Sequence, residues 1–180
     1  MMCFKFKILF NFLLIMYLAV EVISVVDFKN IKCEELDKKF NTFEYCHLKS
    51  VNRTYKYLSL KVKLLQLPVK SVKVNVALYQ RLNGYKPFLY NITVDACKFF
   101  KNQKSNPVAS YFYDFFREFS NINHSCPYNH DLVVDKLSAS AVNHRLTSIL
   151  PFPEGEYMIQ MNWFAYDINR SVFKIYFALS

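Results

Sequence analysis

The densest group of side chains that could carry chemistry lies between residues 121 and 131. It comprises Asn121, Asn123, His124, Ser125, Cys126, Tyr128, His130 and Asp131. A zinc site drawn from its imidazole, thiol and carboxylate groups lacks the usual paired-ligand spacing, and Cys126 is needed for a disulfide. A hydrolase based on Ser125, His130 and Asp131 lacks a nucleophile elbow and an oxyanion glycine. We therefore expect local hydrogen bonds within a disulfide-closed loop, with no catalytic residue, no metal and no cofactor.

The N-terminal segment has the layout of a signal peptide. Two lysines precede an apolar run over residues 8–20, which Glu21 closes. Cleavage is expected after Ser24, with Ala19 as the rival position. A membrane anchor is the alternative, but the run is short for a bilayer span, and no later segment is apolar for long enough. The sequence thus predicts a signal peptide over residues 1–24 and one secreted, extracellular domain over 25–180.

The predicted cleavage also fixes the number of cysteines in the mature domain. It removes Cys3 and leaves Cys33, Cys46, Cys97 and Cys126. An even set in a secreted chain indicates two disulfides. Three pairings are possible. We favour Cys33 with Cys46 and Cys97 with Cys126, because each pair closes a local loop.

Four sequons for N-linked glycosylation fit the same compartment. Their asparagines are Asn52, Asn91, Asn123 and Asn169. Some sequons match by chance, but four together support secretion and a glycoprotein.

The glycine content and the net charge of the chain disfavour some classes of partner. The chain has only two glycines, which leaves little scope for a glycine-rich phosphate loop and disfavours nucleotide chemistry. Its formal net charge is +9. In a secreted protein this charge indicates solubility or an anionic partner at a cell surface, and no nucleic acid is expected.

The clearest secondary-structure signal spans residues 72–97. Apolar and polar residues alternate on both sides of Asn83-Gly84, which predicts a β-hairpin. A two-residue loop would pair Val76 with Asn91 and bury a sequon. A three-residue loop over 82–84, with Gly84 left-handed, instead pairs Val76 with Tyr90 and Val74 with Ile92. We predict this bulged hairpin, with Asn91 facing water.

The remaining pattern predicts a mainly β domain. Two short strands are expected within 25–52, a half-buried strand within 53–67, a strand at 132–137, and an irregular strand or loop at 141–150. Residues 155–169 and 171–179 read as a second hairpin. Asn106 and Pro107 begin one short amphipathic helix, which covers the core or forms a lid over a ligand mouth. Seven or eight strands with this helix form a two-sheet sandwich.

The aromatic content is high, with 18 phenylalanines and 13 tyrosines in the chain. A sandwich core about 10 Å thick has limited room for so many rings. Either they fill an aromatic core or the sheets splay and the rings line a cavity; composition leaves both open.

Several segments resemble a large insect family, best represented in flies, that is catalogued as a domain of unknown function and related to the ML lipid-recognition domains. They are RLNGYKPFLYN at 81–91, DAC at 95–97, NHSCPYNHD at 123–131, FKNIKC at 28–33 and PFPEGEY at 151–157. The resemblance implies an ML-like (immunoglobulin-like) β-sandwich that can hold a lipid between its sheets. It also implies kinship with the chemosensory CheB proteins, some of which are linked to pheromone perception.

The sequence and the resemblance together predict a secreted, non-enzymatic protein that holds a lipid or another apolar small molecule, with a membrane receptor as a further partner. Inward residues of the two hairpins are candidates for the ligand lining: Val76, Tyr90, Ile92, Ile159, Met161, Phe173 and Phe177. The alternative is a structural or interaction protein with a filled core that engages a receptor or an anionic surface through a basic face including Lys61, Lys63 and Lys73. A hydrolase that uses Ser125 is third.

Overall fold

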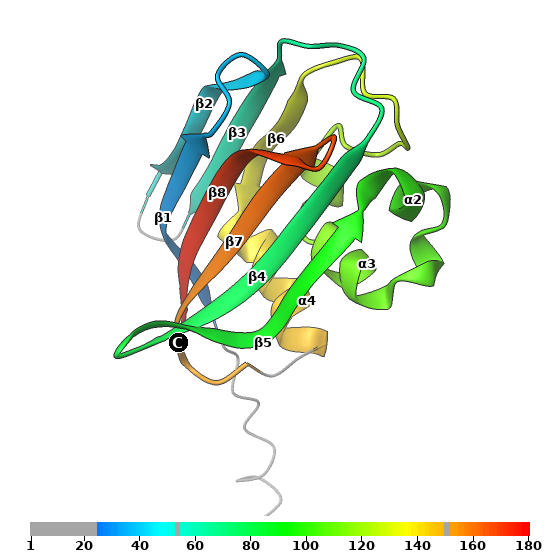
Figure 1. Ribbon diagram of the computed structural model, residues 1–180. Helices are drawn as coiled ribbons and strands as arrows, with labels where there is room; N and C mark the ends of the chain where they lie inside the picture. Colours follow the sequence, from blue (N-terminus) through cyan, green and yellow to red (C-terminus); the bar gives the residue numbers. More distant parts are fainter. Residues whose placement is uncertain (1–24, 53–54, 150–151) are drawn as a thin grey trace, which may run out of the picture.

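The computed structural model describes residues 25–52, 55–149 and 152–180, and the predicted signal peptide lies outside them. Eight strands in this part of the chain form two antiparallel sheets (Figure 1). The larger sheet has the order β1 (Val26–Glu35), β8 (Ile168–Leu179), β7 (Gly155–Ala165), β4 (Val72–Leu82) and β5 (Gly84–Asp95). The smaller has the order β2 (Asn41–Ser50), β3 (Lys56–Leu64) and β6 (Leu132–Ser138). The predicted mainly β, two-sheet sandwich is confirmed.

Helices lie beside β4 and β5 of the larger sheet and below β6 of the smaller sheet (Figure 1). The predicted helix is α3 (Pro107–Asp114), whose first turn is capped by Asn106: its Oδ1 accepts a hydrogen bond from the Ala109 backbone N–H at 3.0 Å. The prediction of one helix is wrong, because α2 (Ala96–Lys101) and α4 (Ala139–Ile149) form as well, with 3-10 turns at Gln103–Ser105 and Arg117–Phe119. Residues 141–149 are thus helical, and the strand or loop expected for this segment is a further error.

Period-two patterning explains the second hairpin. Strands β7 and β8 pair so that Met161 lies opposite Phe173 and Ile159 opposite Ile175. These residues point into the sandwich, and the chain reverses at Tyr166 and Asp167, which both have positive φ. The inner face predicted for this hairpin is confirmed.

The first hairpin, β4–β5, differs from its predicted register. Near the turn the pairing fits the predicted three-residue loop, and Gly84 has φ of 87°. Further along, an irregularity that includes Leu89 at φ 54° shifts the register by two residues, so Val76 pairs with Ile92 rather than with Tyr90. A shift of two leaves each side chain on its predicted face, and Asn91 is exposed.

Two disulfides join parts of the sandwich. Cys33 on β1 bonds to Cys46 on β2 and thereby links the two sheets, and Cys97 in α2 bonds to Cys126 in the loop before β6. These are the pairs that the spacing of the cysteines favours.

A carboxylate reinforces the link between β1 and β2. Oε1 of Glu35 accepts hydrogen bonds from the Thr42 hydroxyl and from the Phe43 backbone N–H, both at 2.6 Å. The Thr42 hydroxyl, followed by the Phe43 N–H, lowers the pKa of Glu35 below its ordinary value of 4.5. Because the folded-state pKa is the lower one, this contribution to stability is present above the unfolded-state pKa and is lost as the pH falls through the folded-state pKa.

We expect Glu35→Gln to lower the free energy of unfolding by about 1 kcal/mol at neutral pH, since the carboxylate is half-exposed and solvent weakens its bonds. The difference from the unsubstituted protein should shrink between about pH 6 and about pH 3. Urea denaturation across this range measures it. Glu34→Gln, at the exposed neighbouring position, is the control, and an equal effect of the two substitutions would contradict the assignment.

Candidate ligand-binding cavity

A cavity of about 120 Å³ lies between the two sheets, where α2 and α3 cover the edge of the sandwich. The larger sheet contributes Val72, Val74, Val76, Ile92, Val94, Met161, Trp163, Phe173 and Ile175. The smaller sheet contributes Leu58, Leu60, Leu132, Val134 and Leu137. The helices and adjoining loops contribute Ala96, Phe99, Phe100, Ala109, Phe112, Tyr113, Phe116, Ile122 and Tyr128. The wall is therefore almost wholly hydrocarbon.

Three smaller cavities adjoin the main cavity along the sandwich, because they share lining residues with it or with one another. One of about 30 Å³ shares Trp163 with the main cavity, and one of about 50 Å³ shares Met161 with it. A fourth, of about 10 Å³, shares Ile159 with the third. These three side chains follow one another along the inner face of β7. The cavities thus form a narrow row parallel to that strand.

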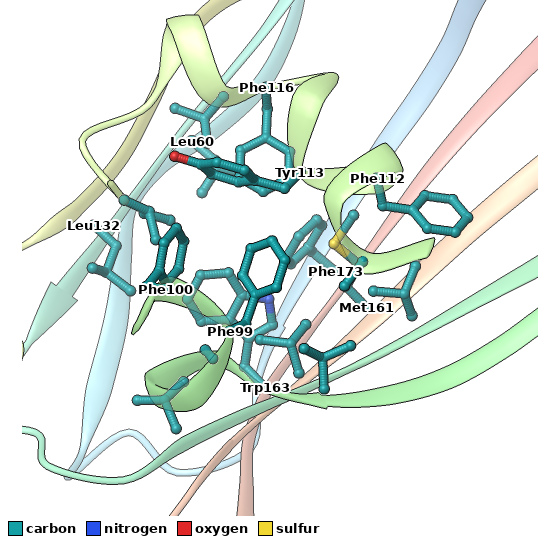
Figure 2. Close-up of a pocket in the computed structure, with 18 of the residues that line it drawn as sticks. Leu60, Phe99, Phe100, Phe112, Tyr113, Phe116, Leu132, Met161, Trp163 and Phe173 are labelled. Atoms are coloured by element: carbon teal, nitrogen blue, oxygen red, sulfur yellow. The ribbon is translucent and has the colours of Figure 1, made fainter. Parts of the chain in front are cut away.

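Aromatic rings from α2 and α3 close the main cavity toward the outside. The rings of Phe99 and Phe100 lie edge-on to Tyr113, with centroids 5.8 and 5.0 Å away, and Tyr113 meets Phe116 edge-on at 5.4 Å. Figure 2 shows these four rings around the cavity, with Tyr113 and Phe116 on one side and Trp163 on the other. Phe100 and Phe116 are half-buried, so these two rings separate the cavity from solvent. This placement fits both roles predicted for the α3 segment, a cover over the core and a lid over a ligand mouth, and the lid stays a prediction.

The candidate lining residues take three positions. Val76, Ile92, Met161 and Phe173 line the main cavity. Ile159 and Phe177 line the smaller cavities of about 50 and 10 Å³. Tyr90 lines none of these four cavities; its ring packs edge-on against Phe112 at 5.5 Å and holds α3 in place. A ligand-binding role for these residues stays a prediction.

The contribution of α2 to the cavity wall could not be predicted from the sequence pattern. Phe99 and Phe100 stand in a six-residue helix that is too short to display a period. The available signal was Asp95, whose side chain caps this helix by accepting from the Lys98 backbone N–H at 3.0 Å. An aspartate four residues before two adjacent phenylalanines is weak evidence without the fold.

Three buried polar atoms near the main cavity have no hydrogen-bond partner among the described residues. They are Nε1 of Trp163 and both amide atoms, Oδ1 and Nδ2, of Asn41. Asn41 is 1% exposed and lines the cavity of about 30 Å³ together with Trp163. The row of cavities therefore has a polar end.

The opposite end of the row carries a phenol. Tyr111 lines the cavity of about 10 Å³, and its buried hydroxyl also lacks a partner among the described residues. Burial raises the pKa of Tyr111 to about 12, so the phenol is neutral at physiological pH.

The polar cluster at 121–131 forms the local network expected for it. The Ser125 hydroxyl donates to the Cys97 carbonyl at 2.7 Å, and the Tyr128 hydroxyl donates to the His124 carbonyl at 2.9 Å. Nε2 of His124 lies 2.8 Å from Nε2 of His130. In the described part of the chain, no group of three or more histidine, cysteine, aspartate and glutamate side chains could hold a metal ion.

The four sequons occupy different surroundings. Asn52, Asn91 and Asn123 are exposed, whereas Asn169 is half-buried. The Asn91 Oδ1 accepts from Asn75 Nδ2 at 2.8 Å, which leaves its own Nδ2 available for a glycan. Glycan occupancy stays a prediction at all four.

The three lysines named for a basic face do not share one surface. Lys61 and Lys63 point outward from β3 in the smaller sheet, and Lys73 points outward from β4 in the larger sheet. Lys61 also pairs with Glu44 at 2.9 Å, and Lys73 pairs with Asp167 at 2.6 Å. Ion pairing thus offsets part of their charge.

Comparison with known families matches residues 74–159, from within β4 into β7, to a family described as "Protein of unknown function (DUF1091)". Among solved structures, a Niemann-Pick type C2 protein from Japanese carpenter ant is similar, with 13% sequence identity and a TM-score of 0.33. That alignment covers 86% of this chain and 90% of the other. Comparison with curated proteins finds no match. The family match agrees with the resemblance to a domain of unknown function, and the insect origin and the kinship with CheB proteins stay predictions.

Proposed function

We propose that this protein is a secreted, non-enzymatic binding protein that holds a narrow apolar ligand between its two sheets. The observation that carries the proposal is the row of cavities along β7, whose walls come from both sheets and from α2 and α3. Apolar cavities of this size stay dry, and an engineered cavity of about 150 Å³ in another protein binds benzene.

The loss of stability caused by an empty main cavity is a second argument that a ligand fills it. Cavities lower stability by about 24 cal/mol per Å³, so the main cavity of about 120 Å³ costs about 3 kcal/mol when unfilled. A ligand that fills it recovers contact with the surrounding rings and removes its own apolar surface from water.

The dimensions restrict the ligand class. Pockets for drug-sized molecules are roughly 300 to 1,000 Å³, well above the main cavity. A flexible single chain needs only the side chains between the cavities to move aside in order to lie along the row from Trp163 past Met161 to Ile159, whereas a rigid fused-ring molecule requires the sheets to separate. We therefore favour a fatty acyl or alkyl chain over a sterol.

The two disulfides support the proposed compartment, because they fit an oxidising environment, in keeping with the predicted signal peptide. As a separate finding, the helices in the described part of the chain include no candidate for a membrane span. A chemosensory or pheromone-related role and delivery to a membrane receptor follow from the resemblance and belong to the proposal.

The alternative, a filled core with a basic receptor-binding face, has less support. The three lysines of the proposed basic face point outward from two different sheets. Two of them, Lys61 and Lys73, already form ion pairs with carboxylates.

Native mass spectrometry of protein secreted by eukaryotic cells and purified without detergent tests the proposal. We expect a population heavier than the protein, after enzymatic deglycosylation, by the mass of one fatty chain, and release of that mass into an organic extract. If every preparation carries no added mass and the protein also takes up no alkane or fatty alcohol on incubation, the proposed function is wrong.

A further inference from the structure

The polar end of the cavity row stands out against its surroundings. Asn41, the first residue of β2, is almost fully buried, and neither its carbonyl oxygen nor its amide nitrogen has a partner among the described residues. The indole N–H of Trp163 is buried and unpaired in the same way. Both side chains line the cavity of about 30 Å³, and Trp163 also lines the main cavity. Two donors and an acceptor therefore gather where the apolar row ends.

Such a grouping is costly unless something binds it. Each buried polar atom left without a hydrogen bond destabilises a fold, and native proteins contain few of them. Of the other unpaired buried atoms in the described chain, the Tyr111 hydroxyl lies at the far end of the row, and Asn169 Oδ1 lines none of the four cavities. Asn41 and Trp163 thus place their unpaired polar atoms together at one end of the cavity row.

We propose that Asn41 and Trp163 bind the uncharged polar head of an amphiphile, most simply a hydroxyl, whose alkyl tail extends from Trp163 past Met161. This deepens the proposed function and rests on it. A hydroxyl accepts two hydrogen bonds and donates one, so it can accept from Trp163 Nε1 and Asn41 Nδ2 and donate to Asn41 Oδ1.

The charge distribution favours a neutral head over a carboxylate. The cation beside this end is Arg170, whose guanidinium pairs with Asp37, lies 4.3 Å above the Phe40 ring and donates from Nε to the Ala165 carbonyl at 3.3 Å. Its charge is thus already balanced by a carboxylate. A second carboxylate moved into this end would lose its hydration without an unpaired cation to replace it.

Competition between dodecane and dodecan-1-ol tests the proposal, because the two share a tail and differ in the hydroxyl. The full secreted protein is freed of any co-purified ligand, and each compound displaces a fluorescent fatty probe. We expect dodecan-1-ol to bind at least about tenfold more tightly than dodecane, as for one or two buried hydrogen bonds. In Asn41→Leu, which keeps the side-chain size and removes both polar atoms, the preference for the alcohol should shrink by at least about threefold, and only the Trp163 N–H is left to support it.

Two further variants complete the design. Trp163→Phe keeps a ring and removes the N–H, and we expect it to reduce the preference for the alcohol by about threefold to tenfold. Tyr111→Phe removes the unpaired hydroxyl at the opposite end and should leave the preference unchanged. Circular dichroism and thermal unfolding confirm that each variant is folded.

The outcomes separate this proposal from the proposed function. Equal affinity of the unsubstituted protein for alkane and alcohol means that Asn41 holds a buried water or nothing, which overturns the head site while the binding function stands. Loss of the preference in Tyr111→Phe instead of Asn41→Leu places the head at the other end and also overturns it. Tighter binding of dodecanoate than of dodecan-1-ol at neutral pH contradicts an uncharged head. Failure of every compound to bind contradicts the proposed function itself.

Discussion

Replacing Ala109 with phenylalanine is expected to lower the affinity for an alkyl ligand by at least about 50-fold. Ala109 is a buried residue of α3 that lines the main cavity, and a phenyl ring added there occupies the space that the ligand needs. Excluding about 100 Å² of ligand surface from an apolar site costs about 2.5 kcal/mol, which gives this factor. Displacement of a fluorescent fatty probe measures the affinity.

The same substitution should not unfold the protein. Filling a cavity of about 120 Å³ with apolar atoms offsets the strain of a larger core side chain, so the melting temperature should stay the same or rise. Lys101→Phe is the matched control, because it adds a ring at an exposed position of the neighbouring helix α2. Binding by a folded Ala109→Phe variant at the affinity of the control would place the ligand outside the cavity.

Removing the Cys97–Cys126 disulfide by the double substitution to serine should lower the free energy of unfolding by about 3 to 4 kcal/mol. The bridge spans 29 positions, and the chain between its ends includes both α2 and α3. Because these helices carry the aromatic wall of the cavity, the variant should also bind the fatty probe at least about tenfold more weakly under conditions in which it is still folded. Urea unfolding and probe displacement measure the two effects.

The second disulfide provides the comparison. Cys33 and Cys46 span 13 positions and join β1 to β2, away from α2 and α3. Their replacement by serine should cost about 3 kcal/mol on the same chain-entropy model but leave the affinity of the folded protein nearly unchanged. Equal losses of affinity in the two variants would mean that the cavity wall depends on overall stability rather than on the local bridge.

Alternation of apolar and polar residues was sufficient to predict the sandwich. The face of β7 that carries Met161 and the face of β8 that carries Phe173 follow directly from period two, and the structure pairs these residues. The helix start at Asn106 was equally predictable from the sequence. Asparagine is a good cap, and its side chain accepts from the free N–H of Ala109. Pro107 takes the first helical position, where its missing N–H costs nothing.

Features that depend on the whole fold could not be predicted from the sequence. The register shift in β4–β5 includes Leu89 at positive φ, a conformation that no local rule assigns to leucine. The segment that forms α4 has a polar, weakly periodic sequence, so the strand or loop expected there was wrong.

The cavity could not be predicted from the sequence either, and the reason is physical. The same aromatic residues can fill a core or line a void, and only the separation of the layers decides between them. Asn41 illustrates the limit most clearly, because a polar residue at the start of a strand normally faces water. Its burial at the end of the cavity row became visible only with the fold.

The most direct measurement of ligand binding between the sheets uses the single tryptophan of the chain as the reporter. Trp163 lines the main cavity, and bromine quenches indole fluorescence on close contact. Titration of the ligand-free protein with 1-bromododecane should therefore quench the emission saturably, at one molecule per chain, and dodecane should reverse the quenching. Emission that stays unchanged up to the solubility limit of the bromoalkane would contradict an apolar ligand in this cavity.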